Sequence, residues 1–500
     1  MTGDAMSRDL RFYLKPWFLA VLVLALTVVK LWSASNSHFV EDEAYYRLWG
    51  LSPALGYYDH PPMIAWWIWL GQWIFGDSVL AARFAVVLSS ALGSLFLWRT
   101  ATILFDRTVA GWAVLFLNAS VLVGVGGILA TPDAPSVFFW GLALWALAEL
   151  HASQKPGWWL AVGLFAGLGL TAKYSVLFLG AGIVLWLLVE PQARKWLLSW
   201  QLWAGGAVAV LCFLPVLYWN HLHDWVSFYK QFGRAGRGTW TVKYILEFVG
   251  AVAGLVNPLI AIPAALGAGA LAGRWRRGDA GASLILLSVI PFLAYLLFHS
   301  LHARVQANWP APLFPAFALM AAVFVGSTSR GLWPKVGLAG VALGMAIAVV
   351  VQIHAVTPLT GTLGRKDPTF QLRGWPEIGT ELSAIAATED ATYIATTGYG
   401  LTGQLSFLFR GDLPVIQLNE RIRYVMQGPV DLSVFGGTGL YVSEERRDNA
   451  ARLGAKFGTV EKVAVLPRTV NGVFLENLVV YRLLDAGGQP LDPVETTVQR

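Results

Sequence analysis

Cysteine and charge are both scarce in this chain of 500 residues. Cys212 is the single cysteine, so the chain can form no internal disulfide and no cysteine-based zinc site. Charged residues make up only 13% of the sequence, whereas hydrophobic residues make up 56% and include 24 tryptophans. Together with a mean hydropathy of +0.57, these values exclude an ordinary soluble domain and predict an integral membrane protein.

Motifs for nucleotide hydrolysis and for zinc proteases are missing as well. The sequence contains no P-loop and no HExxH pair. The net charge of +6 would suit a nucleic-acid partner, but membrane proteins carry excess Lys and Arg on their cytoplasmic loops, which accounts for this charge. We therefore expect the lipid bilayer, and no nucleic acid, as a partner.

Long apolar runs recur up to residue 355. A helix needs roughly 20 residues to cross a hydrocarbon core of about 30 Å, and the runs predict about eleven transmembrane helices. Basic residues precede the first run but no small-residue cleavage site follows it, so we expect an uncleaved signal-anchor helix. The predicted spans are 17–32, 78–104, 109–130, 135–150, 157–172, 175–189, 202–219, 244–272, 281–299, 309–326 and 336–355.

Charged residues separate to the two sides of these spans. If the N-terminus is cytoplasmic, every inside loop is basic, as the positive-inside rule requires. The outside loops then hold nearly all side chains with catalytic potential, so we take the outer face as the functional face. The outer residues are Glu41, Asp42, Glu43, Asp59, His60, Asp133, Lys173, His221, His223, Asp224, Arg234, Arg237, His302 and Arg304.

The first outer loop is rich in aromatic residues. Its stretches 43–53 and 62–75 are too short to span a membrane but contain many Trp and Tyr residues, which favour the membrane interface. We therefore expect interfacial helices that lie flat and hold the charged residues near the level of the lipid phosphates.

The composition changes after residue 356. Strand-like runs alternate with helical stretches there, which predicts a small soluble α/β domain over 356–500 after a transmembrane catalytic domain over 1–355. An odd number of spans would place the small domain outside the cytoplasm. The predicted strands are 391–398, 413–419, 439–444, 461–468 and 475–484, with a helix at 445–458.

Three acidic residues of the outer face are candidates for the chemistry. Asp42 and Glu43 would either balance the dipole of a short helix or supply a general base that removes a proton from an acceptor hydroxyl. Asp133 stands in the turn TPDAP, where it would either cap a helix or join the other acids in catalysis.

Cationic and polar residues of the same face would bind a phosphate or a sugar. Lys173, followed by Tyr174, would either snorkel to the headgroups or bind the ligand. Arg234 and Arg237 are flanked by glycines, which let a guanidinium approach a phosphate and bind it through two hydrogen bonds. A late outer loop adds three further candidates of this kind: His302, Arg304 and Asn308.

A divalent metal is an open alternative on this face. Asp59 and His60 are adjacent, and His221 and His223 lie in another loop, so a site could form between loops. No fixed-spacing motif supports it, and interfacial histidines are more often plain polar anchors. The sequence therefore predicts no certain cofactor.

As a set, these motifs resemble the GT-C superfamily of integral-membrane glycosyltransferases. The shared features are DEAYY (42–46) at the start of the first outer loop, YYDHPP (57–62), a second loop acid, a Lys-Tyr pair after the fifth span, NWPAP (308–312) and RGW (373–375). The chain is most similar to the branch of protein O-mannosyltransferases and bacterial lipid A aminoarabinose transferases, and it also resembles rhizobial galacturonosyl transferases.

This resemblance implies an inverting sugar transfer from a polyprenyl-phosphate donor to a lipid (lipid A or another glycolipid), polysaccharide or protein acceptor. The reaction would occur on the periplasmic side of the bacterial inner membrane. By the resemblance, Asp42 is the base, with Glu43 and Asp133 as catalytic companions. The aminoarabinose branch has a lysine where His60 stands here, which leaves the sugar open. By the same resemblance, Asp59 lies near the acceptor or a metal, and Lys173, Arg234 and Arg237 face the donor phosphate. Resemblance and residue chemistry together predict as substrate-binding residues Tyr58, Asp59, His60, Lys173, Tyr174, Arg234, Arg237, His302, Arg304 and Asn308.

Two other classes of function compete with an enzyme: a lipid or glycolipid transporter or flippase, and a scaffold or receptor. A transporter buries ionisable residues near the bilayer midplane, whereas few such residues, Arg83 and Glu149 among them, lie inside the predicted spans. A scaffold needs neither paired acids nor glycine-flanked arginines. The clustering of these residues on one face therefore favours an interfacial enzyme.

Overall fold

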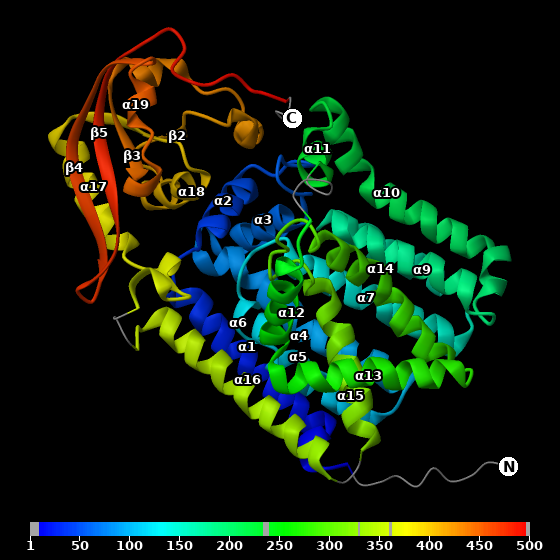
Figure 1. Cartoon of the computed structure of the whole chain (residues 1–500). Helices are drawn as coiled ribbons and strands as arrows, with labels where there is room; N and C mark the ends of the chain where they lie inside the picture. Colours follow the sequence, from blue (N-terminus) through cyan, green and yellow to red (C-terminus); the bar gives the residue numbers. More distant parts are fainter. Residues whose placement is uncertain (1–9, 234–239, 329–330, 360–362, 497–500) are drawn as a thin grey trace, which may run out of the picture.

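The computed structural model describes residues 10–233, 240–328, 331–359 and 363–496. Figure 1 shows a bundle of helices and a smaller part, drawn in yellow to red, that contains a sheet and lies beside one end of the bundle. The bundle consists of α1 (Pro16–Asn36), α2 (Glu41–Leu51), α3 (Met63–Phe75), α4 (Val79–Leu104), α5 (Arg107–Ala119), α6 (Val121–Gly126), α7 (Asp133–Ser153), α8 (Trp158–Leu170), α9 (Leu177–Val189), α10 (Trp200–Leu222), α11 (Val226–Phe232), α12 (Lys243–Val256), α13 (Pro258–Arg276), α14 (Ala280–His299), α15 (Phe314–Ser327) and α16 (Leu332–Val356).

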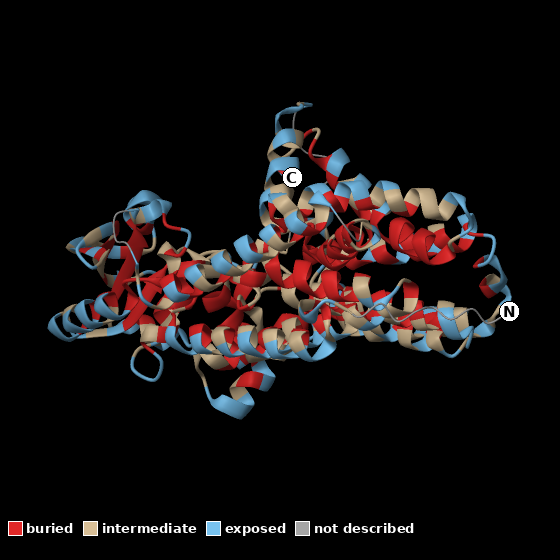
Figure 2. Cartoon of the chain, turned by 90° about the horizontal axis from the view of Figure 1, so that it is seen from below, coloured by how far each residue is buried: buried red, intermediate tan, exposed pale blue. Residues whose placement is uncertain are grey.

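Among the described residues, six helices are long and apolar enough to cross a membrane: α1, α4, α7, α10, α14 and α16. The pair α12 and α13 counts as a seventh span if it is taken as one broken helix, and α3, α8, α9 and α15 are apolar but shorter. Figure 2 shows that buried residues lie between the helices and exposed ones on their outer faces. The predicted polytopic helical fold is confirmed, and the number of eleven spans stays a prediction.

Two predicted spans are wrong as continuous helices. The run 109–130 breaks at Ser120, whose hydroxyl accepts a hydrogen bond from the Val123 amide and so begins α6. The run 244–272 bends by 107° at Asn257, which has a φ of 84° and caps α13 by accepting from the Leu259 amide. Hydropathy missed both breaks because single capping residues hardly change the mean of an apolar run.

The C-terminal part contains a five-stranded sheet in the order β2-β1-β3-β5-β4. β1 pairs in parallel with β2 and β3, whereas β5 pairs antiparallel with β3 and β4. The small α/β domain that the sequence predicts is confirmed in its class. Its elements are α17 (Trp375–Thr388), β1 (Ala391–Thr396), α18 (Tyr399–Leu408), β2 (Val415–Gln417), β3 (Thr438–Glu444), α19 (Ala450–Leu453), β4 (Phe457–Val470) and β5 (Val473–Ala486).

The helix predicted at 445–458 is wrong in extent, since only α19 is α-helical there and β4 already begins at Phe457. The helix α18 was not predicted at all. It connects β1 to β2 and packs across α2, so the C-terminal part is attached to the segment between α1 and α4 (Figure 1).

Glycines allow α18 to lie close to α2. A Cβ placed on Gly403 would be 2.5 Å from the carbonyl carbon of Ala44, and a Cβ on Gly400 would be 2.7 Å from Cβ of Glu41. The Gln404 amide also donates a hydrogen bond of 2.8 Å to the carbonyl oxygen of Phe39. The backbones of two distant segments are thereby held in direct contact.

A second close approach joins α8 to α10 inside the bundle. A Cβ on Gly205 would lie 2.3 Å from the carbonyl oxygen of Trp159. Small residues at such contacts let membrane helices pack backbone against backbone. At the next residue, Gly206, a Cβ would meet no atom within 4 Å.

Gly205→Val and Gly206→Val therefore form a matched pair on neighbouring positions. We expect Gly205→Val to lower the thermal unfolding midpoint of the detergent-solubilised protein by several degrees, because overpacking costs about 1–3 kcal/mol. Gly206→Val should leave the midpoint nearly unchanged. Differential scanning fluorimetry measures both midpoints, and equal values would contradict the close packing of α8 on α10.

Candidate active site

A cavity of about 480 Å³ lies among helices of the bundle. Most of its wall is apolar and comes from α4, α6, α7 and α15. Polar residues stand where α7 begins, and Pro368, Phe370 and Gln371 of the linker to the C-terminal part also line the cavity. The cavity thus combines a mostly apolar wall with a polar end, whose residues include Asp42, Thr131, Asp133, Gln306 and Asn308.

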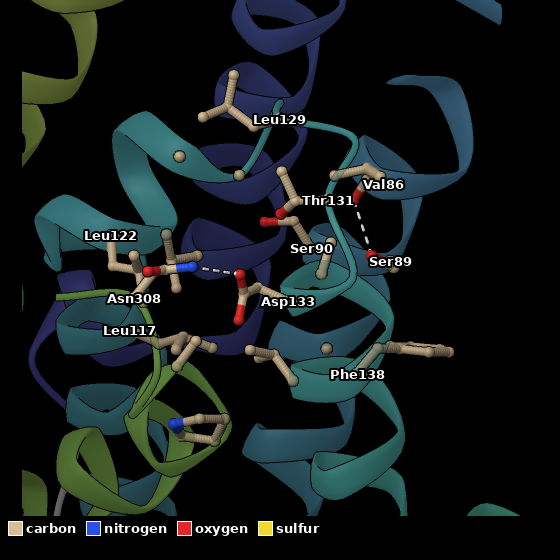
Figure 3. A pocket seen from close by; sticks show the side chains of 18 of the residues that line it. Val86, Ser89, Ser90, Leu117, Leu122, Leu129, Thr131, Asp133, Phe138 and Asn308 are labelled. Atoms are coloured by element: carbon tan, nitrogen blue, oxygen red, sulfur yellow. Dashed lines mark hydrogen bonds between the residues drawn. The ribbon is translucent and has the colours of Figure 1, made fainter. Parts of the chain in front are cut away.

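Asp133 is held by two side chains from distant segments. Lys173 Nζ donates a hydrogen bond of 2.6 Å to Oδ1, and Asn308 Nδ2 donates one of 2.6 Å to Oδ2. Figure 3 shows Asn308 pointing at Asp133 among the residues that line the cavity. Three residues that the sequence singled out separately are therefore brought together, and both oxygens of Asp133 are occupied.

Asp42 lines the same cavity. Its Oδ1 accepts a hydrogen bond of 2.9 Å from the hydroxyl of Tyr399, the first residue of α18. Among the described residues none donates to Oδ2 and none forms an ion pair with this carboxylate. Burial raises the pKa of Asp42, the Tyr399 hydroxyl opposes that rise, and the nearby carboxylates, Asp59 first among them, add to it. Such a carboxyl group has the properties of a general base.

Asp59 is ionised and enclosed by cations. It forms ion pairs with Lys230 of α11 and with Arg423 of the C-terminal part, and it accepts a hydrogen bond of 3.0 Å from the Tyr45 hydroxyl. Burial favours the neutral acid, but the two cations outweigh it and lower the pKa of Asp59 well below its usual range. Lys230 Nζ also lies 3.8 Å from the centroid of the Tyr58 ring.

His60 is neutral near pH 7. Burial, followed by the charge of Lys173, lowers the pKa of its imidazole to about 4. This position therefore contributes a hydrogen-bonding ring and no positive charge.

The metal candidates do not assemble a site in the described part of the chain. No three His, Cys, Asp or Glu side chains there are arranged to hold an ion. His223 stacks on Trp219 with the ring centroids 4.0 Å apart, and His221 is exposed on α10. Asp59 is engaged by its two cations.

Glu43 does not occupy the catalytic place that the sequence suggested. Its side chain is fully buried and bound to Arg83 through hydrogen bonds of 2.8 and 2.6 Å. The amide of Ala130 donates a third hydrogen bond of 2.7 Å. Glu43 is absent from the residues that line the cavity. It instead ties α2 to α4 and to the loop before α7.

Three other candidates lie away from the cavity. Tyr174 donates or accepts a hydrogen bond of 2.9 Å with Ser227 and stacks on Phe228. Arg304 is exposed and paired with Glu247 at 2.9 Å. His302 is buried in contact with the ring of His299. The remaining two candidates, Arg234 and Arg237, lie outside the described residues.

Sequence reasoning missed the residues that the C-terminal part and α11 add to the site, namely Tyr399, Arg423 and Lys230. One signal was available. The stretch GYGLTG (398–403) has the GxGxxG spacing of turns that bind a dinucleotide between a strand and a helix. It does follow β1 and begin α18, but Gly400 and Gly403 are packed on α2. The pattern therefore marks a contact between the two parts of this chain.

Known proteins resemble this chain over most of its length. The family described as dolichyl-phosphate-mannose-protein mannosyltransferase matches residues 59–219. A lipid A galacturonosyltransferase of Rhizobium johnstonii is 27% identical over 400 residues, which cover 78% of this chain and 82% of that protein. An undecaprenyl phosphate-alpha-4-amino-4-deoxy-L-arabinose arabinosyl transferase of Erwinia tasmaniensis is 27% identical over 60% of this chain, and the match spans only 56% of that relative.

Solved structures share the fold. The crystal structure of ArnT from Cupriavidus metallidurans bound to undecaprenyl phosphate superposes with a TM-score of 0.66 at 16% identity, and the match covers 96% of this chain and 100% of that chain. An archaeal oligosaccharyltransferase from Archaeoglobus fulgidus follows with a TM-score of 0.53 at 12% identity, over 86% of this chain and 70% of that chain.

The buried pair of Glu43 and Arg83 gives a stability prediction. Arg83→Gln leaves the Glu43 charge buried and uncompensated, so we expect it to destabilise the protein by about 3–5 kcal/mol. Arg99→Gln is the matched control. Arg99 lies on α4, as Arg83 does, and pairs with Glu149 of α7 at 2.8 Å, but it is 50% exposed and should matter by less than about 1 kcal/mol.

Thermal unfolding of the two arginine variants in detergent compares these effects. If Arg99→Gln lowered the unfolding midpoint as much as Arg83→Gln does, the buried ion pair would stabilise the protein no more than an exposed one.

Proposed function

We propose that this chain, which belongs to the GT-C superfamily of integral-membrane glycosyltransferases, transfers a sugar from a polyprenyl-phosphate donor to an acceptor at the outer face of the membrane. The curated relatives named above are glycosyltransferases that act on lipid A or use an undecaprenyl-phosphate sugar. The fold of an undecaprenyl-phosphate-bound transferase extends over nearly the whole chain.

One observation carries the proposal: Asp42 and Asp133 line the polar end of a cavity whose wall is mostly apolar. A donor with a polyprenyl chain needs apolar walls for its lipid and polar groups for its phosphate and sugar. A water-soluble sugar nucleotide would need no such interior. The arrangement therefore fits a lipid-linked donor.

In the proposed reaction, Asp42 acts as the general base. Its Oδ2 accepts the proton of an acceptor hydroxyl while the hydroxyl oxygen attacks the anomeric carbon of the donor sugar. The bond between that carbon and the phosphate oxygen breaks, and its electron pair leaves on the polyprenyl phosphate. Attack from the side opposite the phosphate inverts the configuration of the sugar.

Positive charge assists the leaving phosphate. Lys173 stands beside the cavity, where Asp133 holds its ammonium group, and Arg423 and Lys230 gather around Asp59. Cations placed where negative charge develops lower the barrier of such a step. In this proposal Asp133 and Asp59 position these cations, and Arg234 and Arg237 remain candidates for the same task.

The acceptor is proposed to be a lipid, with lipid A or a related glycolipid first, because a lipid A transferase matches the chain over 82% of its own length. The neutral His60 argues against a donor contact that requires a fixed positive charge at this position. A polysaccharide or protein acceptor remains the alternative.

The orientation follows from charge. The basic loops would face the cytoplasm under the positive-inside rule, so that the polar end of the cavity and the C-terminal part face the periplasm of a bacterial inner membrane. Donor, acceptor and site would then share one membrane face.

A lipid transporter or flippase is the second candidate function, because a mostly apolar cavity with a polar end would also hold a lipid in transit. Transport requires no proton acceptor, whereas sugar transfer does. The two functions therefore differ in their dependence on Asp42.

Asp42→Asn is expected to lower sugar transfer by about 100- to 10,000-fold, since the amide cannot accept the acceptor's proton, while the protein still folds and inserts. Glu41→Gln is the matched control: Glu41 precedes Asp42 on α2, pairs with Arg447 at 3.9 Å and does not line the cavity. Transfer from a radiolabelled polyprenyl-phosphate sugar in proteoliposomes measures both variants. Full activity of Asp42→Asn would exclude it as the base.

Cysteine labelling tests the orientation. In a Cys212→Ser background, Asp431→Cys should react with a membrane-impermeant maleimide in intact spheroplasts, because residue 431 belongs to the C-terminal part. Lys155→Cys, in a predicted cytoplasmic loop, should react only after permeabilisation. The reverse pattern would overturn the orientation and, with it, the shared outer face of donor and site.

A further inference from the structure

Tyr399 belongs by sequence to the C-terminal part and by position to the active site. It is the first residue of α18, and its hydroxyl donates a hydrogen bond of 2.9 Å to Oδ1 of Asp42. The two residues are 357 positions apart, so the contact exists only when α18 is docked on α2.

The ring of Tyr399 is fixed from several sides. The guanidinium of Arg423 lies 4.7 Å from its centroid, and the ring of Tyr45 lies 5.2 Å away in a tilted contact. Arg423 is itself fixed by its ion pair with Asp59. The hydroxyl thus has one well-defined direction, toward Asp42.

We propose that Tyr399 is a positioning residue for sugar transfer: its hydroxyl holds Oδ1 of Asp42 so that Oδ2 is left to take the proton of the acceptor. This inference rests on the function proposed above. It makes the C-terminal part a component of the active site, because that part supplies the group that orients the base.

The charges around Asp42 explain why the hydroxyl matters. Besides burial, three carboxylates raise the pKa of Asp42: Asp59 of the first outer loop, Glu43 of α2 and Asp133 of α7. Each of the three is paired with a cation. The hydroxyl of Tyr46 is a further titratable neighbour of Asp42. Asp42 has no cation of its own among the described residues, and the Tyr399 hydroxyl is the group that stabilises its charged form there. The neighbouring pairs are Glu43 with Arg83, Asp59 with Lys230 and Arg423, and Asp133 with Lys173.

Loss of the Tyr399 hydroxyl should shift the pKa of Asp42 in one direction. Without this donor the carboxylate is less stabilised, so the pKa of Asp42 rises and the base becomes protonated at a higher pH. Transfer is then lost on the acid side of the pH profile and recovers toward alkaline pH. A purely structural defect would lower the rate at every pH and leave the acid limb in place.

The experiment compares the pH dependence of kcat/KM for Tyr399→Phe and wild type in proteoliposomes. We expect the acid limb of Tyr399→Phe to move up by about one pH unit, as the loss of a hydrogen bond to a charged group predicts. At pH values below the limb, kcat/KM should fall about tenfold or more.

Tyr424→Phe is the matched control. Tyr424 is a buried tyrosine of the same part whose hydroxyl donates to Gln417 at 2.7 Å, so its acid limb should stay in place.

A second replacement guards against a folding defect. Site-specific incorporation of 3-fluorotyrosine at position 399 keeps the shape and makes the hydroxyl a stronger donor, so the acid limb should move to lower pH. Opposite shifts for Tyr399→Phe and for 3-fluorotyrosine would support the positioning role. An acid limb that stays in place in both proteins would overturn it.

A readout without catalysis separates this inference from the proposed function. Infrared difference titration of the purified protein follows the protonation of Asp42, assigned by its absence in Asp42→Asn. The titration midpoint should rise in Tyr399→Phe whether or not the protein transfers a sugar. An unchanged midpoint would refute the inference even if transfer is demonstrated, and a shifted midpoint without transfer would refute only the proposed function.

Discussion

The buried ion pair between Glu43 and Arg83 is the constraint on which the site depends. It fixes α2 against α4 with both side chains withdrawn from solvent. The residues on either side of Glu43 then have defined directions: Asp42 lines the cavity, and the backbone of Ala44 receives α18 at Gly403. Three consecutive residues thus line the cavity, anchor the helix and dock the C-terminal part. A displacement of α2 would disturb all three at once.

Compensation of charge distinguishes the acids of the site. Asp59 and Asp133 each have a cation in direct contact, and the cations around Asp59 lower the pKa of that carboxyl group. Asp42 has a neutral donor, Tyr399, and no ion pair among the residues that the structure describes. A base must release and accept a proton near the working pH. The weakly compensated acid therefore suits the reaction, while the paired acids suit the task of holding cations.

The sequence allowed prediction of the membrane-helix fold, the C-terminal sheet and most polar residues at the polar end of the cavity. Polar residues in an apolar chain are few, so those of the outer loops were easy to find, and Asp133, Lys173 and Asn308 do meet. The roles of Glu43 and Arg304 could not be predicted, because the sequence does not show which residue pairs with each of them. Without the partner, a buried ion pair cannot be told from an exposed one. Tyr399 and Arg423 escaped notice because their contacts cross more than 350 residues, and no local pattern records such a distance.

The glycines of GYGLTG show how a local pattern becomes ambiguous. In a dinucleotide-binding turn, the missing side chains make room for a pyrophosphate at the start of a helix. In this chain the same spacing follows a parallel strand and begins a helix, yet the room is filled by the backbone of α2. Glycine spacing therefore identifies a place where another group must come close to the backbone. Whether that group is a bound ligand or another segment of the chain decides the function of the pattern. Here that segment is α2, which carries Asp42, so the close approach places the hydroxyl of Tyr399 within hydrogen-bonding distance of the proposed base.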